Sequence, residues 1–223
     1  MTDQRRHSSF PTEVTLDLHY LPCLDYFSCL LNFDSFILEA QDHYIRQTYR
    51  NRCYVLTANG IDVLTVPVLS GRNKVLIRDV KIDYGQAWVR RHWGCLQSAY
   101  GKSPFFEYYE AEFKQVYQRQ TTFLFDLNVE LLTLCLKFLG IKKEIAYTLS
   151  YSRDVTSTNF DARSLISDKN TENIFKFHVP IPYYQTFGND FVKNLSIVDL
   201  LFNKGPEARQ ILMQSKLAPP WSD

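Results

Sequence analysis

The stretch QDHYIRQTYRNRCYVLTANGIDVLTVPV, residues 41–68, decides the fold. Its second half places two apolar, β-branched runs on either side of Asn59-Gly60. This is the strongest short-range signal for a β-hairpin, because a type I′ turn needs positive φ at both central residues. The charged and aromatic first half leads straight into the first of these strands. The sequence therefore predicts a hairpin whose polar run is held on a rigid sheet.

Arginines gather in this polar run. With the two-residue period of an extended chain, Arg50 and Arg52 face one side, while Tyr49 and Asn51 face the other. Two interpretations are open. The arginines coat a solvated sheet face, or they clamp an anion, since guanidinium groups bind phosphate and carboxylate in a bidentate way.

The segment before this stretch resembles the first half of an open α/β unit. A strand-like run at 14–19 is followed by a proline-containing loop, a helix-compatible run at 23–32 and a strand at 36–38. In such sheets ligands sit at the carboxyl ends of the strands. His19 and Tyr26 would lie at one such end and Asp42-His43 at the next. We expect these groups and the arginines to line one concave pocket.

Alternation and helical spacing divide the rest of the chain. Strands are expected at 74–83 and 145–151, a sheet edge at 175–184, and helices at 86–101, 103–117, 121–139 and 196–202. The fold class expected is α/β, with a mixed sheet and a β-hairpin packed against an aromatic-rich helical bundle segment. We expect a single domain over residues 14–223, a disordered leader at 1–13 and a mobile polar loop at 152–173.

Composition and charge argue against two classes of protein, nucleic-acid binders and membrane-spanning proteins. The formal net charge of +1 argues against a dedicated nucleic-acid binder, and no apolar run approaches the roughly 20 residues of a membrane helix. The five cysteines are scattered, which favours reduced thiols in a cytoplasmic protein over a disulfide or a metal site.

The candidate site residues fall into two groups. Asp42 or His43 is the best candidate for a general base, with His19 nearby. The candidates for ligand binding are Tyr26, Arg46, Tyr49, Arg50, Asn51 and Arg52. Ser196 and Asp199 have two interpretations: a capped helix whose carboxylate satisfies a buried partner, or the rim of the same cleft. A cysteine nucleophile is permitted by composition, but no spacing singles one out.

Four stretches together resemble the WbqC-like protein family of bacteria. They are HYLPCLDYF (19–27), EAQDHYIRQTYRNRCYV (39–55) with TVPV (65–68), WVRRHWGCLQSAYGKSPFFEYY (88–109) and YYQTFGNDFVKNLSIVDLLFNKG (183–205). The resemblance implies a cytoplasmic bacterial protein, with relatives in gene clusters for O-antigen and other surface polysaccharides. The opening strand, loop and helix also resemble nucleotide-binding folds of the nucleotidylyltransferase type.

Two departures from the family bear on activity. Relatives commonly have glycine where this chain has Asp25, whose carboxylate would repel a ligand phosphate. Many relatives also carry a longer segment where this chain has residues 152–173.

Two functions compete. The first is a transferase-type enzyme, or former enzyme, of surface-polysaccharide or nucleotide-sugar metabolism that binds an anionic small molecule such as a nucleotide or nucleotide-sugar. The alternative is a non-catalytic interaction protein of a biosynthetic complex, which would expose the aromatic helices between Trp88 and Tyr117. The sequence fixes neither a cofactor nor the oligomeric state.

Overall fold

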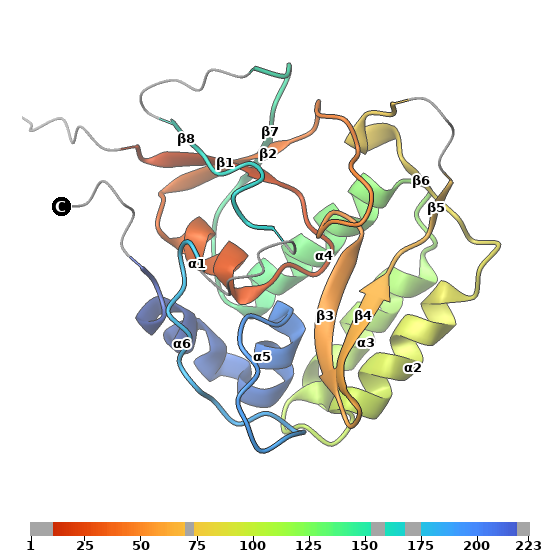
Figure 1. Ribbon diagram of the computed structural model, residues 1–223, viewed down its shortest axis with the longest axis vertical. Coiled ribbons are helices and arrows are strands. Elements are labelled where there is room, and N and C mark those ends of the chain that lie inside the picture. The colour runs from red at the N-terminus through yellow and green to blue at the C-terminus, as the bar shows by residue number, and fades with distance from the viewer. Residues whose placement is uncertain (1–10, 70–73, 153–158, 168–174, 218–223) are drawn as a thin grey trace, which may run out of the picture.

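A computed structural model of the chain describes residues 11–69, 74–152, 159–167 and 175–217. A four-stranded parallel sheet, in the order β7-β2-β1-β8, lies at the upper left of Figure 1. Its strands are β1 (Glu13–Asp17), β2 (Ser35–Glu39), β7 (Ile145–Tyr147) and β8 (Asn159–Asp161). Because all four run the same way, their carboxyl ends meet at one edge.

Strand β8 lies where we predicted only a polar loop. It pairs with β1 from Glu13↔Asn159 to Thr15↔Asp161, and the ring of Phe160 stacks on Phe33 with 5.6 Å between ring centroids. Three residues are too few to show a two-residue period, so this strand could not be predicted from the sequence. The predictions for 1–10, 153–158 and 168–174 lie outside the described residues.

The predicted hairpin is present. Strands β3 (Arg52–Thr57) and β4 (Gly60–Thr65) pair antiparallel. Thr57 pairs with Gly60, whose φ is +97°, while Asn59 has no positive φ, so the turn is not type I′. The polar run before β3 is irregular rather than part of the sheet, which corrects the prediction that it lies on a strand.

The strand predicted at 74–83 is largely wrong. That segment holds a 3₁₀ turn, η1 (Ile77–Asp79), and only two strand residues, β6 (Lys81–Ile82), which pairs with β5 (Val68–Leu69). The segment 175–184 forms no sheet edge either: His178 makes a single isolated bridge, to Lys216. Pro180 and Pro182 lack the N–H groups that a sheet ladder needs.

The predicted helices are present with shifted ends. Helix α3 begins at Phe106, and Ser103 donates its hydroxyl to the Tyr100 carbonyl rather than capping that helix. The helices are α1 (Leu24–Leu31), α2 (Trp88–Tyr100), α3 (Phe106–Gln118), α4 (Leu124–Phe138), α5 (Ile197–Lys204) and α6 (Ala208–Gln214), with a 3₁₀ turn η2 (Gly205–Glu207) before α6.

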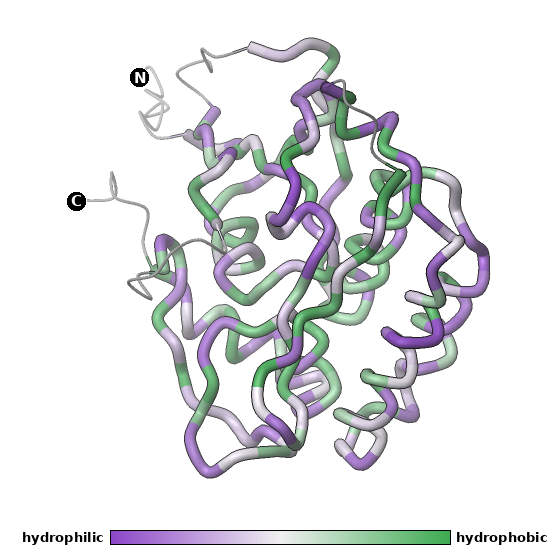
Figure 2. Tube along the Cα trace, turned by 45° about the vertical axis from the view of Figure 1, so that its right-hand side comes forward, coloured by the Kyte–Doolittle hydropathy of each residue, from purple (hydrophilic) through white to green (hydrophobic). Residues whose placement is uncertain are grey.

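Helices α2 and α3 lie beside the hairpin at the lower right of Figure 1, and β3 contacts α2 and α5. Hydrophobic and hydrophilic residues alternate along both helices in Figure 2, as in amphipathic helices. Tyr20 hydrogen-bonds both His92 (2.8 Å) and Tyr117 (2.6 Å) in the buried centre, so His92 is a packed, hydrogen-bonded histidine. The predicted fold class is thus confirmed.

Candidate functional site

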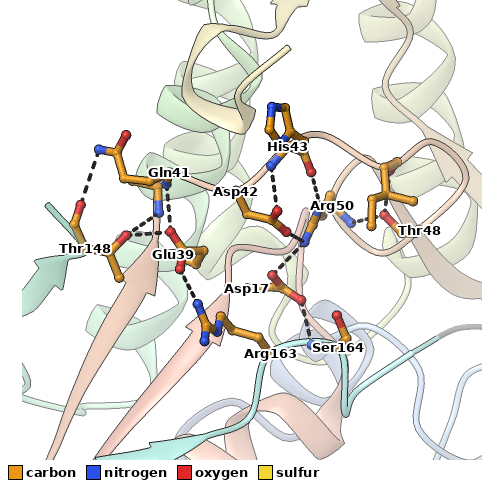
Figure 3. Close-up of polar contacts among 12 residues, drawn as sticks. Asp17, Glu39, Gln41, Asp42, His43, Thr48, Arg50, Thr148, Arg163 and Ser164 are labelled. Carbon is orange, nitrogen blue, oxygen red and sulfur yellow. Dashed lines mark hydrogen bonds and ion pairs between the residues drawn. The ribbon is translucent and has the colours of Figure 1, made fainter. Parts of the chain in front are cut away.

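Charged residues gather at the carboxyl edge of the parallel sheet (Figure 3). Asp17, Glu39 and Asp161 end β1, β2 and β8. Two arginines from outside the sheet bridge these carboxylates and Asp42. We name these residues the sheet-edge charge network: Asp17, Glu39, Asp42, Arg50, Asp161 and Arg163.

Arg50 is the centre of one half of the network. Its guanidinium binds Asp17 at 2.8 Å, Asp42 at 2.7 Å and the His43 carbonyl at 2.6 Å, and its side chain is 5% exposed. Burial alone raises the pKa of the Asp17 carboxyl, but Arg50, His19 and the Ser164 N–H outweigh it and lower that pKa. The guanidinium is therefore committed to internal partners, which corrects the prediction that Arg50 and Arg52 project together from a sheet face.

Arg163 is the centre of the other half. It binds Glu39 at 2.7 Å and Asp161 at 2.8 Å, and its guanidinium lies 5.0 Å from the Tyr151 ring centre. Glu39 also accepts hydrogen bonds from the Gln41 N–H (2.7 Å) and the Thr148 hydroxyl (2.6 Å). These bonds tie the chain leaving β2 to the chain leaving β7.

Residues Gln41–Arg46, which we name the rim segment, cross this edge. Backbone hydrogen bonds hold it against the η1 region: Ile77 N–H donates to the Asp42 carbonyl (2.9 Å), and Tyr44 N–H donates to the Val75 carbonyl (2.8 Å). The His43 ring points away from the network into an exposed position, while Asp42 stays partly buried beneath it (Figure 3). Two candidate bases thus sit on a fixed backbone.

Arginines surround Tyr44 on this segment. Burial raises the pKa of the Tyr44 hydroxyl to about 12, although the charges of Arg46, Arg52 and Arg50 act in the opposite direction. Of the two arginines besides Arg50, Arg46 is exposed and Arg52 is half-buried.

The other predicted ligand residues on this side lie behind the network, inside the core. The ring of His19 packs 4.9 Å from Tyr26 and 5.3 Å from Tyr49, and burial lowers the pKa of His19 to about 4. Asn51 donates to the Val66 carbonyl at 2.9 Å. His19 therefore faces Asp17 from the interior, and the open pocket that we expected around His19 and Tyr26 is closed by packing.

Asp199 satisfies buried partners, as the first of the two interpretations predicts. Ser196 occupies the N-cap position of α5, but its side chain makes no capping hydrogen bond. Ser196 donates to the Leu21 carbonyl (2.9 Å), and Asp199 accepts from Tyr183 (2.6 Å) and Gln185 (2.9 Å). Both are buried. They join α5 to neighbouring chain rather than reaching the rim segment.

A cleft of about 860 Å³ adjoins the rim segment. It lies beyond the carboxyl ends of β2 and β7, against η1 and α4. We name it the sheet-edge cleft. Its polar lining includes Gln41, Arg78, Asp79, Asp126, Glu130 and Thr148, and its apolar lining includes Phe125 and Tyr147. Except for Gln41, which lies in the polar run, sequence reasoning missed these residues because they come from three distant segments.

Asp25 has a structural role. Its carboxylate accepts the Phe177 N–H (2.8 Å) and the Lys176 N–H (3.3 Å), while burial raises its pKa. The residue therefore attaches residues 176–177 to the start of α1. Burial also raises the pKa of the Cys23 thiol to about 12, which disfavours the reactive thiolate that a cysteine nucleophile needs.

The described residues contain no group of three or more His, Cys, Asp and Glu placed to hold a metal ion. No helix in the described ranges is long and apolar enough to cross a bilayer.

The parallel sheet and its helices make this a protein of the α/β class, and charged residues line the carboxyl edge of the sheet. The model of the WbqC-like protein family matches residues 18–169 and 156–211, so the chain belongs to the WbqC-like protein family. It is also similar to "Uncharacterized protein Rv1507c" of Mycobacterium tuberculosis, with 29% identity over 219 residues, covering 87% of this chain and 94% of that protein. No solved structure matches the chain significantly.

Proposed function

We propose that this protein is a transferase-type enzyme of nucleotide-sugar or surface-polysaccharide metabolism, whose anionic, sugar-bearing substrate lies on the rim segment. The observation that carries the proposal is the position of that segment. It crosses the carboxyl edge of a parallel sheet, where α/β folds bind ligands. Buried ion pairs and backbone hydrogen bonds hold it there.

The sheet-edge charge network supports this proposal, because burying its ion pairs costs free energy that a structural role alone does not require. Buried ion pairs contribute little net stability compared with apolar residues of the same volume. Here Arg163 holds two carboxylates at strand ends, Glu39 and Asp161, and Arg50 joins the strand-end carboxylate Asp17 to Asp42 on the rim segment. Such an arrangement fixes Asp42 and His43 in place, which a general base needs if it is to meet its substrate at hydrogen-bond distance.

The surroundings suit a sugar phosphate. Arg46 and Arg52, next to Tyr44, supply positive charge for a phosphate group. On the other side, the sheet-edge cleft offers carboxylate and amide groups for sugar hydroxyls and the rings of Phe125 and Tyr147 for the apolar face of a sugar. In this arrangement His43 lies between phosphate and sugar and acts as the general base, with Asp42 as its structural neighbour.

The test is a thermal-shift screen with nucleotide-sugars such as UDP-glucose and GDP-mannose. A ligand that binds only the folded state raises the midpoint of unfolding. We expect a shift in the wild type that is lost in His43→Asn and reduced in Arg46→Gln, both exposed positions. Arg209→Gln on α6 is the matched control and should keep the shift. A shift that both rim variants retain in full contradicts the proposal.

The alternative, a non-catalytic interaction protein, depended on an exposed aromatic face. Trp88 and Tyr117 are buried, and Trp93 and Tyr109 are half-buried and packed against the core. Tyr108 on α3 is 78% exposed, but it is a single ring. These helices therefore do not present the broad aromatic surface that this version of the alternative requires.

A further inference from the structure

A second cavity lies between the first turns of α2 and the last turns of α3. It measures about 390 Å³, within the range of small-molecule sites. We name it the α2–α3 groove. The lining residues that matter here are Tyr84, Arg90, Trp93, Lys114, Gln118 and Gln120.

Two basic side chains line the groove. Arg90 and Lys114 are both exposed side chains on its lining, and none of its described lining residues is acidic. The neighbouring carboxylate, that of Asp83, is outside the lining and accepts hydrogen bonds from the Gly85 N–H (2.9 Å) and the Gln86 amide (2.8 Å). An anion entering the groove would therefore meet two cations.

The groove also has fixed aromatic rings. Trp93 packs against Phe106 and Tyr117, with 6.1 and 6.3 Å between ring centroids, and the Lys114 ammonium lies 6.0 Å from the Trp93 ring centre. The Tyr84 hydroxyl donates to the Thr121 carbonyl at 2.9 Å, which restrains that ring. Rings held in this way offer a stacking surface at little entropic cost.

Glutamine amides complete the lining. Gln118 and Gln120, from the end of α3 and the loop after it, each have a donor and an acceptor side. Cations, flat rings and amides together match three features of one ligand class: a phosphate, a planar ring and polar ring edges.

We propose that the α2–α3 groove binds a planar aromatic anion of the mononucleotide class. The base stacks on Tyr84 and Trp93, the phosphate pairs with Arg90 and Lys114, and the glutamine amides hydrogen-bond the edge of the base. This site is separate from the rim segment, and it stands whether or not the proposed function holds.

The experiment is calorimetric titration of the intact chain with AMP and UMP, and with adenosine as the uncharged probe. We expect Arg90→Gln and Lys114→Gln each to weaken binding about tenfold, because each removes a charge-assisted contact. Adenosine should bind about tenfold or more weakly than AMP for the same reason. Binding of AMP should also weaken as salt is raised.

Arg91→Gln is the matched control. Arg91 lies next to Arg90 on the same helix but pairs with Asp62 at 3.2 Å and does not line the groove. It should leave AMP affinity unchanged. Because all three positions are exposed, loss of binding cannot be ascribed to unfolding if the circular dichroism spectrum is preserved.

Two results overturn the inference. One is unchanged AMP and UMP affinity in both Arg90→Gln and Lys114→Gln, or no binding to the wild type. The other is binding that Arg46→Gln abolishes and Arg90→Gln leaves intact, which would place the nucleotide on the rim segment. Failure of the proposed function is seen separately, as nucleotide-sugar shifts that persist in His43→Asn.

Discussion

The sheet-edge charge network and the α2–α3 groove use basic side chains in opposite ways. In the network, the Arg50 side chain is 5% exposed, and its guanidinium binds two carboxylates and a backbone carbonyl. In the groove, Arg90 and Lys114 are exposed and no described lining residue opposes them. The first set of charges therefore holds the backbone in place, whereas the second set lies exposed on the lining of a cavity.

The largest effect expected from this comparison is on stability. Arg50→Met should lower the free energy of unfolding by about 3–5 kcal/mol, because it leaves the buried Asp17 carboxylate without its ion pair. Urea unfolding measures the change. The control Arg91→Met breaks an exposed pair with Asp62 and should cost at most about 1 kcal/mol. Equal losses in the two variants would mean that Arg50 is not the buried centre of the network.

The next effect is a dependence of stability on pH that comes from His19, on the interior side of the network. Burial lowers the pKa of His19 from 6.5 to about 4, so between these values the unfolded chain binds a proton that the folded chain does not. Stability contributed by neutral His19 is therefore complete above pH 6.5 and lost as pH falls to about 4, by up to about 3 kcal/mol.

Urea unfolding at several pH values checks this. His19→Gln should lose less stability than the wild type between neutral pH and pH of about 4. The raised pKa values of Asp25 and Asp199 act in the opposite direction at low pH, and they are common to both proteins. Parallel curves for the two proteins would contradict a neutral, buried His19.

A smaller effect is expected where the network meets the sheet-edge cleft. Thr148 donates its hydroxyl to Glu39 (2.6 Å) and accepts the Ala40 N–H (3.0 Å). Thr148→Val keeps the shape but removes both bonds, which should cost about 1–2 kcal/mol. Thr133→Val on α4 is the matched control, since its hydroxyl is exposed and donates to the Val129 carbonyl of the same helix. Equal losses of unfolding free energy in the two variants would mean that Thr148 does not support Glu39.

The smallest effect on stability belongs to the groove. The double variant Arg90→Gln with Lys114→Gln should change the free energy of unfolding by no more than about 0.5 kcal/mol, as exposed substitutions usually do. A loss comparable to that of Arg50→Met would show that these cations support the fold and would erase the contrast between the two regions.

Much of the fold could be predicted from the sequence because its signals are local. Helix periodicity located α2 and α4, and the Asn-Gly pair located the hairpin. Strand β8 could not be found, since so short a strand is defined by its partner far along the chain. Apolar and polar residues alternate at 74–83 and predicted a strand there. That segment instead bridges to the rim segment and forms a 3₁₀ turn.

The candidate site was predicted only in part, for the same reason. The sequence singled out Asp42, His43 and Arg50, and the structure brings all three together. It could not show that Arg50 turns inward, because its partner Asp17 ends a strand 33 residues away. Arg163 was missed within a segment that had no period, although it anchors half of the network.

The central claim is that the rim segment on the carboxyl edge of the sheet receives the substrate. A crystal structure grown with a nucleotide-sugar that raises the unfolding midpoint tests it most directly. The account predicts density for the sugar within hydrogen-bond distance of His43 and Gln41, with the phosphates near Arg46. Density confined to any other surface, with the rim segment empty, would contradict the account.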